Sequence, residues 1–557
     1  MKIVQRFLAL LVALFIPFVF AGAHSPQRFA DNEDESKAKA RIRSDFIDAL
    51  NLVAENYAGN LTQESYDKLY KASILGMLHT LDPHSGYFDK KEWEDFQNDQ
   101  RSRYSGIGAF IGQRNGKVYI MSPFNGTPAY KAGIRYGDQI IEINGESTEN
   151  WTQQQVSNKL IGPEGTPVTV KLSRAGAAQP LEFKLVRGSV PLPSISNYSL
   201  IPGGIGYINM LRGFNTTTFS EMSNALADLK QQGMTSLILD LRGNRGGLVD
   251  QAGKVTNQFL YLGQKIVTLR GRPDVFQPKE LLAKNANPDD YPLVILIDRG
   301  SASASEIVAG ALQDHDRARL VGENSFGKGL VQNIFPLQGG AGLTLTTGHY
   351  YTPSGRLIQR EYANRSFYDY LFNSDRDLTK RTDERKTDSG RTVYGGGGID
   401  PDVEVKVSTK EFELRRLWWE PTFQFARSLV NGQIAGFPEF KIDRQPNHSH
   451  RLQAGEYAVN DKLVAEFKKY LATYKAQYKD SKVDEARLAK DMEWVRRQIR
   501  YEAVQAAYGQ EVATQVLYDN DVQLQRGIAE IPKAKEMSER IRGERAAARA
   551  NRNGKDE

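Results

Sequence analysis

The chain has 557 residues, which is long enough for several domains, and its content of 40% hydrophobic and 25% charged residues is ordinary for a globular protein. Its 73 basic and 67 acidic residues give a formal net charge of +6, which is too slight and too dispersed to predict a nucleic-acid partner. No cysteine is present, which excludes both a disulfide framework and lipid attachment through cysteine.

Residues 1–23 have the pattern of a secretory signal peptide. Lys2 and Arg6 precede an apolar stretch at residues 7–20, and Ala21-Gly-Ala23 supplies small residues at a cleavage point. About 14 apolar residues are short for a membrane span. We therefore expect export to the periplasm with cleavage of the signal. The alternative is an uncleaved anchor that keeps the protein associated with the membrane.

Residues 24–103 are predicted to form a helical region, because apolar side chains recur there at helical spacing. The first series is Ile42, Phe46, Ala49, Leu50, Val53 and Tyr57. The second is Tyr66, Leu69, Tyr70, Ile74, Met77, Leu78 and Leu81.

Residues 104–188 carry an ordered set of glycine-containing motifs. Gly-Ile-Gly-Ala at residues 106–109 is followed by a short strand, a turn-rich segment at 126–145 and a helix at 152–160. This set resembles a PDZ domain. The resemblance implies that the backbone of Gly106, Ile107, Gly108 and Ala109 receives a terminal carboxylate while the peptide adds as a strand.

A second glycine-containing loop, Asp-Leu-Arg-Gly-Asn-Arg-Gly-Gly at residues 240–247, follows an apolar run that predicts a strand. Backbone N–H groups without obstructing side chains can stabilise the oxyanion of an acyl-transfer intermediate. We select Gly246, together with the amide of Ala304, as that pair of donors. A glycine turn with no catalytic duty is the alternative interpretation.

The segment Ser-Ala-Ser-Ala-Ser-Glu-Ile at residues 301–307 opens a predicted helix. Ser303 is the candidate nucleophile, with Ser301 and Ser305 as competitors, because the sequence does not say which hydroxyl faces a base. Ser303 and Glu306 also fit a capping box, so an ordinary N-cap is the alternative.

Lys328 follows Ser303 by 25 residues, after a predicted strand at 319–322 that returns the chain toward the start of the helix. A lysine can act as a base only when burial lowers its pKa from about 10.4 toward neutrality, at a cost of roughly 4 kcal/mol for about three units. Gly327 and Gly329 allow close packing around the amine, and Gln332 on the next predicted strand can orient it.

Three other patterns are rejected. Residues 322–329 nearly spell a phosphate-binding loop, but Gly329 replaces the hydroxyl that would hold magnesium. Asp314 and His315 follow Ser303 by about 16 Å of straight helix, too far for a catalytic triad, so Asp314 is taken as structural. The His-Ser-His at residues 448–450 lacks acidic or cysteine neighbours, so no metal or other cofactor is expected.

The chain from residue 410 onward becomes helical again. Three amphipathic stretches begin near residues 414, 463 and 488, and their apolar faces favour internal packing over a partner interface. The charged tail at 539–557 is either a solvated helix or a disordered segment.

Taken together, the motifs at 301–307, 327–329 and 240–247 resemble the carboxyl-terminal processing proteases, also called tail-specific proteases. The likeness extends to Leu-Asp-Pro-His-Ser at 81–85, Tyr-Thr-Pro-Ser-Gly at 351–355 and Gly-Gly-Ile-Asp-Pro-Asp at 397–402. It implies Ser303 as nucleophile, Lys328 as general base and Gln332 as its orienting partner. Arg245 departs from the pattern, since relatives often have a smaller residue or proline there.

The predicted fold class is a multidomain α/β protein, with a PDZ domain before a mixed β-sheet and helix protease core and helical regions at both ends. The predicted divisions are a signal peptide (1–23), an N-terminal helical region (24–103), the PDZ domain (104–188), the core (189–407), a C-terminal helical region (408–538) and a tail (539–557). Residues 364–392 are predicted to be an exposed insertion.

The predicted function is a periplasmic serine endopeptidase that recognises unstructured, apolar C-terminal tails of proteins and cleaves them with a Ser/Lys dyad. An adaptor or activator protein and self-association through the terminal helices are further hypotheses about partners. A non-catalytic adaptor that only binds tails, and a hydrolase of small esters or amides, are the alternatives.

Overall fold

The computed structural model describes residues 35–100, 102–273, 276–363, 369–370, 382–478 and 481–553. The chain divides into two compact units, Met1–Ser73 and Ile74–Glu557. The predicted signal peptide lies outside the described residues. Within those residues, no helix combines the length and the apolar character that crossing a membrane requires.

Both predicted N-terminal helices are present, as α2 (Glu35–Asn56) and α3 (Gln63–His79). The apolar series predicted on the first of them is exposed to solvent. Its members include Ile42, Phe46, Leu50 and Val53, with 62%, 53%, 40% and 39% of their surface exposed. The predicted helix is therefore confirmed, but its apolar side chains do not form a core within the described chain.

The PDZ region contains a sheet with the strand order β3-β4-β5-β7-β8, and β6 pairs with β5. The predicted helix at 152–160 is confirmed as α6 (Gln153–Leu160), which Thr152 and Gln155 cap reciprocally. A two-stranded ribbon of β2 and β9 joins this region to the rest of the chain. The bounds are β2 Arg103–Gly106, β3 Ala109–Arg114, β4 Lys117–Pro123, α5 Pro128–Lys131, β5 Gln139–Ile143, β6 Glu146–Ser147, β7 Pro167–Ser173, β8 Leu181–Val186 and β9 Gly188–Pro191.

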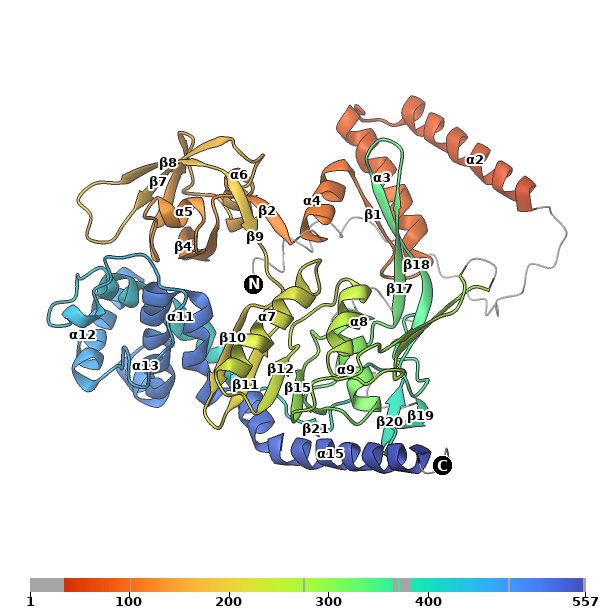
Figure 1. Cartoon of the computed structure of the whole chain (residues 1–557). Helices are drawn as coiled ribbons and strands as arrows, with labels where there is room; N and C mark the ends of the chain where they lie inside the picture. Colours follow the sequence, from red (N-terminus) through yellow and green to blue (C-terminus); the bar gives the residue numbers. More distant parts are fainter. Residues whose placement is uncertain are drawn as a thin grey trace. The chain divides into compact units, whose positions relative to one another are not determined.

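The main sheet of the core has the order β10-β11-β12-β15-β16-β21, in which only β10 runs antiparallel to its neighbour. Parallel strands buried on both faces read as continuous apolar runs, as in Leu293–Ile297. Helices α7, α8 and α9 cover one face, with which they share the largest hydrophobic cluster (Figure 1). The bounds are β10 Asn197–Ile201, β11 Ile205–Asn209, α7 Thr218–Gln231, β12 Ser236–Asp240, α8 Val249–Asn257, β15 Leu293–Ile297, α9 Ala304–Asp314, β16 Arg319–Gly322 and β21 Val403–Glu404.

A second, antiparallel sheet lies beside the main one and is built around the long strand β18. β17 pairs along one edge of β18, while β1 and β13 share its other edge. The bounds are β1 Gly86–Phe88, α4 Lys90–Gln100, β13 Lys265–Gly271, β14 Lys279–Leu282, β17 Leu330–Pro336, β18 Gly342–Tyr351, β19 Thr382–Lys386 and β20 Thr392–Gly395.

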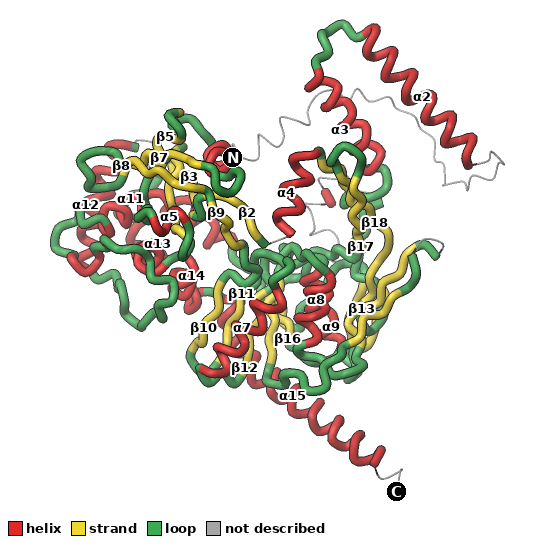
Figure 2. Tube along the Cα trace, turned by 45° about the horizontal axis from the view of Figure 1, so that its top comes forward, coloured by secondary structure: helices red, strands yellow, loops and turns green. Residues whose placement is uncertain are grey.

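The C-terminal helices α11, α12 and α13 pack against the PDZ region, and Figure 2 shows the two lying side by side. Tyr119, Met121 and Tyr136 of the PDZ region are buried in the same cluster as the apolar faces of these helices. The Tyr136 hydroxyl also donates to Glu502 over 2.7 Å. Internal packing, as predicted, therefore extends to the PDZ region. The bounds are α11 Thr409–Val430, η2 Pro438–Phe440, α12 Asp461–Gln477, α13 Glu485–Tyr508, α14 Gln510–Ala513 and η3 Thr514–Asn520.

The last helix, α15 (Val522–Asn553), covers the second face of the main sheet. Leu524 and Ala534 are buried there against Val294 and Leu296, so helices enclose the sheet on both sides (Figure 1). Of the two alternatives for the charged tail, the helix is observed as far as residue 553.

The predicted exposed insertion at 364–392 lies largely outside the described residues. The expectation is wrong for Tyr370, which is 1% exposed. Its hydroxyl contacts His84 Nε2 over 2.7 Å, and its ring packs edge-on to Phe326. Tyr370 is thus buried, although the segment around it is polar in sequence.

Candidate active site

Two loops meet at the carboxyl ends of the parallel strands β12 and β15, which is where open α/β sheets usually place their sites. The loop after β15 leads into Ser303, directly before α9. Ser303 has φ +57° and ψ −115°, a sparsely populated conformation that costs about 1–3 kcal/mol and usually marks a functional residue. An ordinary N-cap is extended, so this backbone is not that of a simple capping serine.

The three serines of the motif differ in how far their side chains are exposed. Ser301 and Ser305 are 1% and 0% exposed, and their hydroxyls donate to the carbonyls of Leu241 and Asn244, each over 2.8 Å. Ser303 is partly exposed and lines a cleft. Ser301 and Ser305 therefore fasten the turn, while the side chain at 303 is the accessible one.

Lys328 lies on the loop before β17 and lines the same cleft as Ser303. Burial lowers the pKa of Lys328, and the nearby carboxylates of Asp82 and Glu306 oppose that shift. The Lys328 Nζ donates to Gln332 Oε1 over 2.7 Å, so the predicted orienting contact is present. This hydrogen bond holds the partly buried amine in place beside Gln332.

Gln332 is oriented by the segment before β1. Its Nε2 donates to the carbonyl of His84, so its Oε1 must face Lys328. Asp82 shapes that segment, because its carboxylate accepts from the N–H groups of His84 and Ser85 over 2.8 and 2.7 Å. Burial, together with the charge of Lys328, lowers the pKa of His84 to about 4, so this imidazole is neutral near pH 7.

Glu306 joins the backbones of the two candidate catalytic residues. Its side chain is 0% exposed, and Oε2 accepts the N–H of Ser303 over 2.8 Å and that of Lys328 over 2.9 Å. Oε1 accepts the N–H of Gly327 over 2.7 Å and the hydroxyl of Ser325. Burial raises the pKa of Glu306, and these four donors counteract that effect.

Tyr350, on β18, forms a second bridge between the same two residues. Its hydroxyl lies 3.0 Å from the carbonyl oxygen of Ser303 and also contacts that of Lys328. Because Glu306 holds the N–H groups and Tyr350 holds the carbonyls, the start of α9 and the Lys328 loop are fixed to each other through backbone atoms.

The loop at 240–247 approaches the candidate nucleophile, Ser303, closely at Gly246. A Cβ at this position would lie 2.7 Å from Ser303 Cβ and 2.9 Å from the nitrogen of Ala304, and φ is +96°, so only glycine fits. The N–H of Gly246 donates to Asn244 Oδ1 over 2.9 Å. The predicted donor therefore lies beside Ser303 but, in this conformation, is engaged within its own loop.

The cleft that holds Ser303 and Lys328 has a volume of about 730 Å³. About half of its lining residues are apolar, and the others are glycines and polar or charged residues. The apolar lining residues are Phe88, Phe96, Leu248, Val249, Val267, Leu269, Leu281, Leu330, Val331 and Ile334. Such walls suit an extended peptide with apolar side chains.

Asp314 and His315 lie at the opposite end of α9 from Ser303. Asp314 Oδ1 pairs with Arg356 over 2.7 Å, and both side chains are almost fully buried. His315 contacts Asp388 and the carbonyl of Lys265, each over 2.7 Å. These contacts make Asp314 a structural residue, as the helix geometry predicted.

The predicted metal-free loop at 448–450 lies beside the C-terminal helices. His450 stacks on Tyr508 with 3.8 Å between ring centroids, and its Nε2 lies 2.8 Å from Glu456. Among the described residues, no group of three His, Cys, Asp or Glu side chains could hold a metal ion.

Sequence reasoning missed Asp82, His84 and Tyr350, and it assigned Glu306 only a capping role. The motif at 81–85 was noted for its resemblance, but nothing in the sequence predicts that it reaches Gln332. Such contacts join residues more than 200 positions apart, and no local pattern encodes them.

The predicted tail-binding residues lie where β2 passes into β3. Gly108 has φ +77°, and a Cβ there would lie 2.3 Å from Thr127 Cβ. Its carbonyl accepts from the Thr127 hydroxyl over 2.8 Å. β3 is the edge strand of its sheet among the described residues, so its outer side can accept an added strand.

Comparison with known families agrees with this geometry. Residues 204–364 match the model of peptidase family S41, and residues 120–174 match that of the PDZ domain. The fold and the site thus define a serine-type peptidase with a PDZ domain.

Relatives narrow the class further. A carboxy-terminal-processing protease of Bartonella bacilliformis is 39% identical over 357 residues, which cover 62% of this chain and 80% of the relative. The carboxy-terminal processing protease CtpB of Bacillus subtilis is 34% identical over 335 residues, which cover 60% and 68%. The solved photosystem II D1 C-terminal processing protease is 25% identical and covers 64% of this chain and 86% of its own, with a TM-score of 0.33. This chain belongs to the carboxy-terminal processing protease family.

Proposed function

We propose that the protein is a periplasmic endopeptidase that captures the C-terminal tails of proteins through its PDZ domain and cleaves them with a Ser303/Lys328 dyad. The double bridge of Glu306 and Tyr350 carries this proposal, because it holds the backbones of Ser303 and Lys328 together in one cleft. The buried amine of Lys328 supplies the base.

In the proposed mechanism, neutral Lys328 takes the proton of the Ser303 hydroxyl while Gln332 holds the amine. Ser303 Oγ attacks the peptide carbonyl, and the resulting oxyanion is stabilised by the N–H groups of Gly246 and Ala304. Lys328 then protonates the leaving amine. Water, deprotonated by Lys328, hydrolyses the acyl-enzyme and regenerates the Ser303 hydroxyl.

The oxyanion site requires one rearrangement. The Gly246 N–H must turn away from Asn244 Oδ1, which is a rotation of the peptide between Arg245 and Gly246. Glycines at 246 and 247, with φ values of +96° and +143°, give the backbone that freedom. The Ala304 N–H, at the first position of α9, points outward from the helix end.

Tail recognition is proposed for the outer edge of β3 beside the Gly106–Ala109 turn. A peptide added there would pair with β3, and its carboxylate would meet the backbone donors of the turn. Capture of an unstructured, apolar tail agrees with the apolar side chains that form about half of the walls of the catalytic cleft. An adaptor or activator protein at the same edge remains a further hypothesis.

The catalytic assignment is tested by incubating the purified chain with an unfolded protein and comparing it with Ser303→Ala and Lys328→Ala. We expect cleavage to be lost in both variants. Undiminished cleavage by both would refute the site, and absence of cleavage by all three proteins, with candidate adaptors added, would favour a binding protein.

The tail-binding assignment is tested by a point variant, because deletion of residues 104–188 would expose the core that the PDZ domain shares with α11–α13. Gly108→Ala should lose binding of an apolar C-terminal peptide and cleavage of tailed proteins. Cleavage of a short fluorogenic peptide should persist. Equal loss on both substrates would contradict a dedicated tail site.

Export rests on Lys2, Arg6 and the apolar residues 7–20. Cell fractionation and N-terminal sequencing of the mature protein test it, and an intact N-terminus in the cytoplasm would refute it.

Self-association is proposed for the exposed apolar series of α2, which includes Ile42, Phe46 and Leu50. Single helices are marginally stable in water, so such a series gains from a second copy. Light scattering should show an oligomer that Phe46→Glu disrupts, and a monomeric native chain would refute this proposal.

A further inference from the structure

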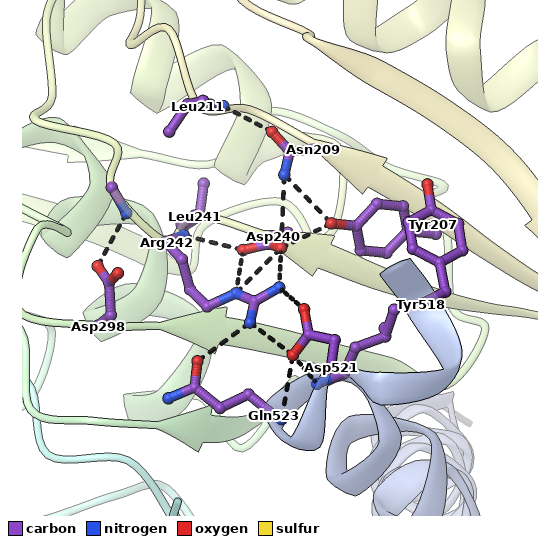
Figure 3. Close-up of polar contacts among 12 residues, drawn as sticks. Tyr207, Asn209, Leu211, Asp240, Leu241, Arg242, Asp298, Tyr518, Asp521 and Gln523 are labelled. Carbon is purple, nitrogen blue, oxygen red and sulfur yellow. Dashed lines mark hydrogen bonds and ion pairs between the residues drawn. The ribbon is translucent and has the colours of Figure 1, made fainter. Parts of the chain in front are cut away.

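Arg242, in the loop at 240–247, is held by Asp240 of the same loop and by Asp521 and Gln523 of the C-terminal region (Figure 3). Its Nη2 donates to Asp240 over 2.6 Å, and its Nε lies 2.9 Å from the same carboxylate. From the other side, Nη1 and Nη2 donate to the two oxygens of Asp521 over 2.9 and 2.7 Å. Nη1 also donates to Gln523 Oε1 over 3.0 Å. Two carboxylates and an amide thus fix this guanidinium in one place.

Asp521 and Gln523 belong to the start of α15. Asp521 Oδ1 accepts the N–H groups of Gln523 and Leu524 over 3.1 and 3.0 Å, so Asp521 caps the helix while it binds Arg242. Gln523 Nε2 donates to the carbonyl of Val405 over 2.7 Å, just beyond β21. The first turn of α15 is therefore anchored both to the sheet and to the loop.

On its other side, the loop at 240–247 is hydrogen-bonded to residues 298–305, which we call the nucleophile turn because they include Ser303. The N–H of Gly243, next to Arg242, donates to Asp298 over 2.8 Å. The carbonyl of Asn244 accepts the N–H of Ala302 over 2.9 Å and the hydroxyl of Ser305 over 2.8 Å. Arg242 thus lies between the cap of α15 and the turn that carries Ser303.

We propose that Asp521 is a positioning residue for hydrolysis, which acts through Arg242 to hold the loop at 240–247, and Gly246 with it, beside Ser303. This inference rests on the proposed function. Gly246 lies within van der Waals contact of the nucleophile turn, so a displacement of the loop by a fraction of an ångström changes the place of the oxyanion donor. Catalytic geometry is sensitive to displacements of that size.

Asp521 lies outside the segment 204–364 that matches the peptidase family. It follows η3 and α14, which continue directly from α13, and α13 shares a core with the PDZ domain. The C-terminal helical region therefore contributes to the geometry of the active site in addition to supporting the PDZ domain.

The variant Asp521→Asn separates positioning from folding. Asparagine caps helices as well as aspartate does, so the bonds to Gln523 and Leu524 are kept. Its amide nitrogen then faces the Arg242 guanidinium, and the charge-assisted pair is lost. We expect kcat to fall about ten-fold, less than the roughly 10²- to 10³-fold loss that removal of an oxyanion donor causes, because Arg242 still binds Asp240.

Three readouts distinguish this from a structural effect. KM should stay within about two-fold and the thermal midpoint within a few degrees of the native values. Inhibition by a peptide aldehyde, whose adduct with Ser303 carries an oxygen in the oxyanion position, should weaken in parallel with kcat. Asp521→Glu should recover part of the activity. Asp290→Asn is the matched control, because Asp290 forms an exposed ion pair with Arg542 at the other end of α15, and it should leave kcat unchanged.

A double-mutant cycle tests the route through Arg242. In an Arg242→Gln background, Asp521→Asn should cause no further loss of kcat. Native kcat in Asp521→Asn, or its full effect in the Arg242→Gln background, would overturn the inference. If Ser303→Ala is inactive while Asp521→Asn is fully active, the inference fails and the proposed function stands. Cleavage retained by Ser303→Ala would instead overturn the proposed function.

Discussion

Replacing Glu306 by glutamine should disable the active site while leaving the fold intact. Four donors point at the two oxygens of this carboxylate, namely the N–H groups of Ser303, Gly327 and Lys328 and the hydroxyl of Ser325. Glutamine has one acceptor oxygen and one NH₂ group. The NH₂ group of the glutamine, which is itself a donor, must therefore face at least one of these four donors.

The cost follows from the two orientations of the amide. If the oxygen stays toward Ser303 and Lys328, the hydroxyl of Ser325 can turn and accept, and only the N–H of Gly327 loses its partner. A buried donor without a partner costs about 1–3 kcal/mol. The reverse orientation strands two backbone N–H groups and costs about 2–6 kcal/mol, so the first is preferred. Because Gly327 directly precedes Lys328, the proposed base, we expect kcat/KM to fall about 10²-fold.

The assay measures two properties of the native chain and of each variant. These are the rate at which it cleaves an unfolded substrate protein and the thermal midpoint of its own unfolding. Glu502→Gln is the matched control, since Glu502 is equally buried but accepts from Tyr136 and Gln498 in the C-terminal region. The control should lose stability and keep kcat. Native kcat/KM in Glu306→Gln, or an equal loss of kcat in Glu502→Gln, would refute the reasoning.

Three further predictions concern other parts of the molecule. Because burial lowers the pKa of Lys328 and the neutral amine is the proposed base, kcat/KM should rise with pH and level off below the ordinary lysine range. A rise centred near pH 10.4 in the pH–rate profile would contradict this. Asp314→Asn breaks the buried pair with Arg356 and should lower stability by about 3–5 kcal/mol in urea unfolding, with kcat per folded molecule retained; a selective loss of kcat would make Asp314 catalytic. Gly108→Ala places a methyl group against Thr127 at φ +77°. It should weaken peptide binding by the PDZ domain at least ten-fold, about 1.4 kcal/mol, as measured by a binding isotherm. Unchanged affinity would show that the turn relaxes.

Local patterns in the sequence predicted the elements well. The strand at 319–322, the strand from 330 and the helix that begins after Ser303 were each read from composition and spacing, and each is present. The contact between Lys328 and Gln332 was also predicted and is present. The predicted reason, alternation along one strand, does not apply, because Lys328 lies in the loop before β17 and the strand has a register shift at Val331 and Gln332. The helices at both ends of the chain were also predicted from a local pattern, the helical spacing of their apolar residues.

Only the tertiary structure decided which groups surround the amine of Lys328. His84, in the segment before β1, reaches Gln332 on β17. Tyr350, on β18 of the second sheet, reaches the backbone of Ser303, which follows β15 of the main sheet. Asp521 reaches Arg242 across 279 residues. Short-range patterns report which face of an element is apolar, whereas the pairing of distant loops depends on how whole layers pack. The sequence by itself therefore determined the elements and indicated Ser303 and Lys328 as the candidate pair, and packing decided the environment that lowers the pKa of the lysine and holds the serine in place.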